Sequence, residues 1–130
     1  MSIATNLAPP VVAVLVTKEP GAWFDEVLDG LVAQDYENLR VLAIDRGDRP
    51  IASQVLDKIP EAVVAQAADS KGFGDAANKV QTLVEGCTFY LFLHDDVALA
   101  PDAVSFLVAE ALESNAGIFG PKILRWDDPS

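Results

Sequence analysis

Residues 89–96 read FYLFLHDD, an apolar run that closes on one histidine and two aspartates. A run of this length, rich in aromatic residues, is typical of a β-strand buried on both faces. His94, Asp95 and Asp96 then stand where that strand leaves its sheet, shortly before a helical pattern that begins at Pro101. In open α/β sheets, ligands bind at this carboxyl edge of the strands. The stretch therefore predicts a buried strand with a binding site at its end.

Asp95 and Asp96 point to a metal site. Adjacent carboxylates repel each other, and an acid pair that closes an apolar strand is costly without a partner. A hard divalent cation removes that cost, because Mg²⁺ and Mn²⁺ bind oxygen ligands and often take one or two carboxylates plus substrate phosphates. We therefore expect Mg²⁺ or Mn²⁺ on this pair. His94 is expected to be a hydrogen-bonded structural residue rather than a ligand.

Apolar runs and helical patterns alternate along the whole chain. Strands are predicted over 11–16, 39–44, 62–65, 88–93 and 117–124, and helices over 22–33, 51–58, 73–84 and 101–114. Such alternation gives right-handed crossovers and an α/β fold, with a mostly parallel sheet and helices on both of its faces. We expect one domain over residues 1–130, cut from a longer protein.

Polar residues follow three of the predicted strands. Thr17 follows the first, Asp45 the second, and Asp95 with Asp96 the fourth. In a parallel sheet these ends share one edge, so the residues should meet. Taken singly, Thr17 is as compatible with an ordinary strand end as with a site residue, and Asp45 before Arg46-Gly47-Asp48 fits turn chemistry somewhat better than a site role.

Composition narrows the classes of partner. The chain has 130 residues, 51% of them hydrophobic, and a formal net charge of −11. That charge argues against nucleic acid or an anionic membrane surface as a partner, although a bound metal would still allow a nucleotide to bind. The single cysteine, Cys87, excludes an intrachain disulfide. With neither a secretory signal nor a membrane-length apolar run, the chain is expected to be cytoplasmic.

Four segments together resemble a known family. They are VVAVLVT (11–17), LVAQDYENLRVLAID (31–45), KGFGDAANK (71–79) and YLFLHDDVALAPDAV (90–104). They resemble the nucleotide-sugar half of family 2 glycosyltransferases, whose GT-A fold is Rossmann-like. The turn AQ-x-Y-x-N and the segment DD-x4-P carry most of the likeness, and GPKILRWDDP (120–129) is similar to actinobacterial members.

The resemblance implies roles for residues that would surround a nucleotide. Thr17 matches a position near the nucleobase. Asp45 matches the first acid of an Asp-Asp-Gly-Ser motif that contacts the base or the ribose, with Arg46 in place of the second acid. Lys71 and Asn78 fall in the segment that usually lines the nucleotide pocket.

Asp95 and Asp96 match the family's DxD-type signature. By that match Asp96 binds the metal, and Asp95 holds the ribose or the metal. His94 stands where many members carry a first acid.

The implied function is binding of a UDP- or GDP-sugar by part of a metal-dependent glycosyltransferase. A glycan or a lipid-linked molecule would be the acceptor in the full-length protein, which is expected in the cytoplasm or at the cytoplasmic face of the membrane. The base that deprotonates the acceptor is expected downstream of residue 130, so no catalytic residue is assigned here and the chain alone should not transfer sugar. The alternatives are a nucleotidyltransferase and a non-catalytic α/β interaction module. Metal-dependent binding of a nucleoside diphosphate separates the enzymes from the module.

Overall fold

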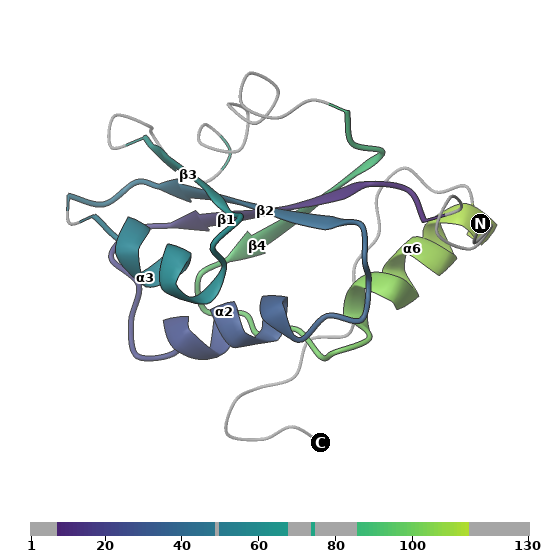
Figure 1. Cartoon of the computed structure of the whole chain (residues 1–130), viewed down its shortest axis with the longest axis horizontal. Coiled ribbons are helices and arrows are strands. Elements are labelled where there is room, and N and C mark those ends of the chain that lie inside the picture. Colours follow the sequence, from purple (N-terminus) through teal and green to yellow (C-terminus); the bar gives the residue numbers. More distant parts are fainter. Residues whose placement is uncertain (1–7, 49, 68–73, 75–85, 115–130) are drawn as a thin grey trace.

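The computed structural model describes residues 8–48, 50–67, 74 and 86–114 (Figure 1). Strands and helices alternate in this part of the chain, as predicted. In order they are β1 (Val11–Thr17), α2 (Phe24–Val32), β2 (Leu39–Asp45), α3 (Ala52–Lys58), β3 (Val63–Gln66), β4 (Phe89–His94) and α6 (Ala103–Ser114). The strand predicted over 117–124, and all but residue 74 of the helix predicted over 73–84, lie outside the described residues.

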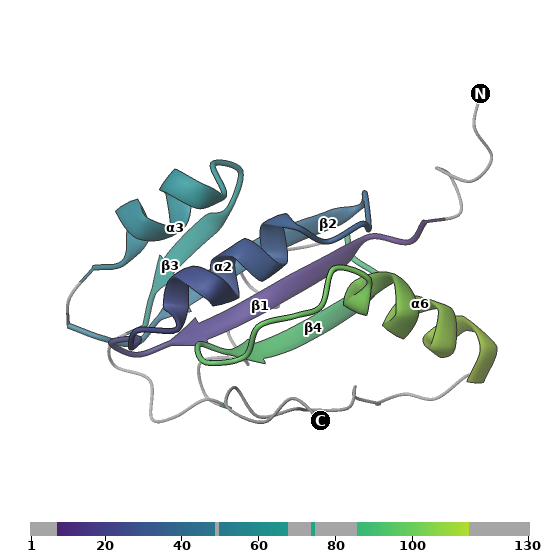
Figure 2. The ribbon, with the colours of Figure 1, turned by 90° about the horizontal axis from the view of Figure 1, so that it is seen from below.

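The strands form one sheet in the order β3-β2-β1-β4, and every neighbouring pair is parallel (Figure 2). Parallel neighbours cannot be joined by a tight hairpin, so helices α2 and α3 supply the crossovers from β1 to β2 and from β2 to β3. The register pairs Thr17 with Asp45 and Val16 with His94, which brings three strand ends to one edge. The predicted α/β class with a parallel sheet is confirmed.

Strand β1 is the centre of the core, and all seven of its residues are buried. Alternate side chains of a strand point to opposite faces, so β1 contributes to two apolar clusters. On one face, Ala13 and Leu15 pack with residues of α2 and α3, both of which lie on that side of the sheet (Figures 1 and 2). On the other face, Val12, Val14 and Val16 pack with residues of β2. Burial on both faces explains why β1 is continuously apolar.

Helix α2 packs through Phe24 rather than through Trp23. Trp23 is one of the apolar residues of the helix predicted over 22–33, but it precedes the first residue of α2 and is 45% exposed. The buried positions are Phe24, Val27, Leu28 and Leu31. These follow the i, i+3, i+4, i+7 spacing of one helix face, which Trp23 misses by one residue.

Strand β4 differs from the prediction that it is buried on both faces. Leu93 is buried, whereas Tyr90 and Phe92 are exposed, with ring centroids 6.1 Å apart. Leu91 and Leu93 alternate with these two residues and join the cluster that contains α2 and α3 residues, so Tyr90 and Phe92 lie on the opposite face of β4. An apolar run identifies a strand but does not reveal whether both of its faces are buried.

Helix α6 packs Val104 and Val108 against Val11, at the beginning of β1. Leu112, near the end of the same helix, is exposed. Among the described residues, no helix combines the length and the apolar character needed to cross a lipid bilayer.

Candidate donor-binding site

The predicted meeting of strand ends occurs between β1 and β4. The Thr17 hydroxyl donates a hydrogen bond to Asp95, with Oγ1 and Oδ2 2.9 Å apart. The backbone N–H of Lys18 donates to the same Oδ2 at 3.1 Å. Residues 78 positions apart in sequence are therefore in direct contact at the carboxyl edge of the sheet.

Asp45 lies on the other side of Thr17 and has no exposed surface. Its Oδ1 accepts the Gly47 N–H at 2.9 Å, and its Oδ2 accepts the Ile51 N–H at 3.3 Å and the Gln66 side-chain amide at 3.1 Å. Buried polar groups require such partners, and here one carboxylate joins the end of β2 to the start of α3 and to β3. The geometry shows a structural anchor. A contact between Asp45 and a base or ribose stays a prediction.

Gly47 follows Asp45 where the chain has little space. A Cβ atom at this position would lie 3.0 Å from the Glu19 backbone nitrogen, in the loop after β1. The two loops that leave β1 and β2 are therefore in close contact, and glycine is the residue that permits it.

The carboxylates of Asp95 and Asp96 are ligands of the kind that a hard cation binds. Asp96 is exposed and Asp95 is partly buried, with one oxygen already oriented by Thr17 and Lys18. Two carboxylates match the small number of protein ligands that Mg²⁺ or Mn²⁺ needs when phosphates complete its shell. Among the described residues, no group of three or more His, Cys, Asp or Glu side chains gathers around one point. Lys71 and Asn78 lie outside the described residues.

The loop that follows Asp96 is held by α2. Leu99 packs so closely on Gly30 that a Cβ atom there would lie 3.1 Å from the Leu99 backbone nitrogen and oxygen. Gln34 donates to the carbonyl of Ala100 at 2.7 Å and accepts the N–H of Val104 at 3.0 Å. One glutamine thereby fixes the loop and satisfies an N–H in the first turn of α6.

A family model for glycosyl transferase family 2 matches residues 12–130. The chain belongs to glycosyltransferase family 2. The comparison with curated proteins gave no match. The family resemblance deduced from the four sequence segments is confirmed.

Solved structures show the fold of this family 2 chain. S. aureus TarS 1–349 in complex with UDP-GlcNAc matches with a TM-score of 0.70 and 20% identity, over 89% of this chain and 37% of TarS 1–349. Mannosyltransferase PcManGT from Pyrobaculum calidifontis, in complex with GDP-Man and Mn²⁺, matches with a TM-score of 0.68 and 19% identity, over 79% of this chain and 32% of the other. The fold is the Rossmann-like GT-A fold, and the chain spans well under two thirds of either structure.

The AQDYEN turn of this family 2 chain, residues 33–38, holds the segment that precedes β1, and the sequence did not predict this role. Besides the contacts of Gln34, the Tyr36 hydroxyl donates to the Pro9 carbonyl, and the Asn38 amide donates to the Ala8 carbonyl at 2.9 Å. Partial burial raises the pKa of the Tyr36 hydroxyl. The sequence shows three polar or aromatic residues close together in this turn. It does not show what they bind, because their partners are distant in sequence.

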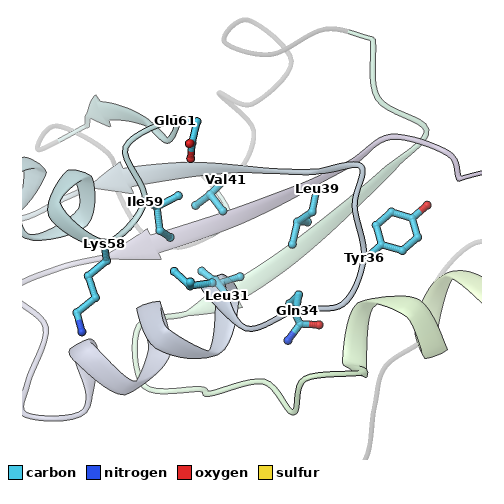
Figure 3. Close-up of a pocket in the computed structure, with 9 residues that line it drawn as sticks. Leu31, Gln34, Tyr36, Leu39, Val41, Lys58, Ile59 and Glu61 are labelled. Atoms are coloured by element: carbon cyan, nitrogen blue, oxygen red, sulfur yellow. The ribbon is translucent and has the colours of Figure 1, made fainter. Parts of the chain in front are cut away.

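A pocket of about 220 Å³ lies away from this site, between α2, α3 and the first half of β2 (Figure 3). Leu31, Leu39, Val41 and Ile59 give it an apolar lining. The Lys58 amine, on its lining, lies 2.7 Å from the Asp29 carboxylate, and this hydrogen bond raises the pKa of Lys58. The pocket contains neither Asp95 nor Asp96, so it is separate from the candidate donor site.

Proposed function

We propose that this family 2 domain binds a nucleotide-diphosphate sugar, with UDP or GDP as the nucleotide, together with Mg²⁺ or Mn²⁺. The proposal rests on the Asp95–Asp96 pair at the carboxyl edge of the parallel sheet, where Thr17 and Lys18 hold the first carboxylate. Two solved structures with the same fold support it: TarS holds UDP-GlcNAc, and PcManGT holds GDP-Man and Mn²⁺.

The proposal gives each predicted site residue a role. Asp96, which is exposed, would bind the metal, and Asp95 would bind the metal or the ribose. Asp45 would shape the part of the sheet's carboxyl edge where the nucleotide binds, and Lys71 and Asn78 would line that part. A bound cation would supply positive charge that offsets the negative charge developing on the diphosphate as its bond to the sugar breaks. A cation at this site would also offset part of the repulsion between the diphosphate and a chain whose formal net charge is −11.

Sugar transfer itself would require residues beyond this chain. The acceptor, a glycan or a lipid-linked molecule, must lose a proton to a general base, and we propose that this base lies downstream of residue 130. The lengths of the structural neighbours support the proposal, because the chain covers only 37% of TarS 1–349 and 32% of PcManGT. We therefore expect donor binding without transfer.

Calorimetric titration of UDP and GDP, with Mn²⁺ and with excess chelator, tests the proposal. We expect binding that requires the metal and that weakens at least about tenfold in Asp96→Ala, because loss of a metal ligand removes the bridge to the phosphates. Asp57→Ala is the matched control, since it removes one exposed carboxylate from α3 and should bind as the wild type does.

Two outcomes would contradict metal-dependent binding of the nucleotide-sugar at this site. One is nucleotide binding that is unchanged by the chelator. The other is equal affinity in Asp96→Ala and Asp57→Ala. If the folded chain and a longer, folded protein both bind neither nucleotide, the non-catalytic interaction module becomes the better explanation.

A further inference from the structure

The side chain of Thr17 faces another residue of the protein, not an open pocket. It is 1% exposed and ends the central strand β1. Its one hydroxyl proton is used in the 2.9 Å hydrogen bond to Asp95 Oδ2. In this arrangement Thr17 cannot also donate a hydrogen bond to a nucleobase. Family resemblance placed Thr17 near the base, whereas the geometry gives it a different partner.

The contact with Thr17 fixes the orientation of the Asp95 carboxylate, to which the proposed function assigns the metal or the ribose. Thr17 Oγ1 and Lys18 N both donate to Oδ2, and a carboxylate is planar, so holding one oxygen sets the direction of the other. The β-branched side chain of threonine has few χ1 rotamers, and the strand holds its backbone in the sheet. The hydroxyl is therefore in place before any ligand arrives.

We infer that Thr17 is a positioning residue that orients the Asp95 carboxylate for the metal-bound diphosphate, and that it does not select the nucleobase. This inference rests on the proposed function of the Asp95–Asp96 pair. Residues that hold a metal ligand in place commonly change metal affinity about 10–100-fold when they are replaced.

The test compares Thr17→Val, which keeps the shape and removes the hydroxyl, with Thr17→Ser, which keeps the hydroxyl. Thr88→Val is the matched control, an exposed threonine that precedes β4. Binding of UDP and of GDP is titrated at a series of Mn²⁺ concentrations. In Thr17→Val, the Mn²⁺ concentration at half-maximal UDP binding should rise about 10–100-fold, as expected for loss of a residue that orients a ligand. Thr17→Ser and Thr88→Val should stay close to the wild type.

The ratio of UDP affinity to GDP affinity separates positioning from base recognition. A positioning residue leaves this ratio unchanged, whereas a residue that contacts the base alters it. An altered ratio in Thr17→Val, or a half-saturating Mn²⁺ concentration equal to that of Thr88→Val, would overturn the inference while leaving metal-dependent donor binding intact. A wild type that binds neither nucleotide would instead remove the proposed function, and this inference with it. If Thr17→Val does not fold, Thr17→Ala gives the same comparison.

Discussion

Replacing Asp45 with alanine tests whether one buried carboxylate holds the carboxyl edge together. The change removes the acceptor for the buried N–H groups of Gly47 and Ile51 and for the Gln66 side chain. Gln66 is exposed and can turn to water, but the two backbone donors cannot. A buried donor left without a partner costs about 1–3 kcal/mol, so two such donors predict a loss of about 3 kcal/mol in the free energy of unfolding.

Urea denaturation followed by circular dichroism measures this loss. With a slope near 1.5 kcal/mol per molar urea, the midpoint should fall by about 2 M. Asp45→Asn should lose less, because it retains one acceptor oxygen. The control Asp48→Ala removes an exposed carboxylate three residues further on and should change stability by less than about 0.5 kcal/mol. If Asp45→Ala unfolds at the same midpoint as Asp48→Ala, the carboxylate is not the anchor that its contacts indicate.

Three further predictions concern α2 and its neighbours. Gly30→Ala should lower the midpoint of thermal unfolding, because its new Cβ atom would lie 3.1 Å from the Leu99 backbone, and this clash outweighs the roughly 1 kcal/mol that alanine gains over glycine in a helix. The control Gly21→Ala should not lower the midpoint, because no atom lies within 4 Å of its Cβ. Gln34→Ala should cost about 1–2 kcal/mol and speed amide hydrogen exchange at the start of α6, and unchanged exchange there would contradict its role. Hydrogen bonding to Asp29 raises the pKa of Lys58. The stability that this pair adds is therefore present below the pKa of Lys58 in the unfolded chain and is lost as pH rises through its pKa in the folded chain. Asp29→Asn should remove part of the decline in stability at alkaline pH, and an unaltered pH profile would show that the pair contributes nothing.

The sequence predicted correctly that three strand ends meet at one edge of the sheet, because this meeting depends only on the parallel pairing of the strands. Thr17, Asp45 and Asp95 each follow an apolar run, and parallel pairing makes their proximity necessary. The sequence does not reveal which atoms make contact. The Thr17–Asp95 hydrogen bond depends on the register between β1 and β4, and the burial of Asp45 depends on three donors from separate elements.

The alternation of apolar runs and helical patterns along the sequence determined the α/β class and the parallel sheet, because a strand that returns through a helix lies parallel to the one before it. Residue type at the end of each apolar run determined where polar groups leave the sheet. The tertiary structure decided that Phe24 rather than Trp23 is buried, that Tyr90 and Phe92 are exposed, and which side chains hold the loops in place. Gln34 illustrates the difference, since its partner Ala100 lies 66 positions away. Such a contact is set by how helices and strands pack together, and that packing is not contained in the spacing of residues along the chain.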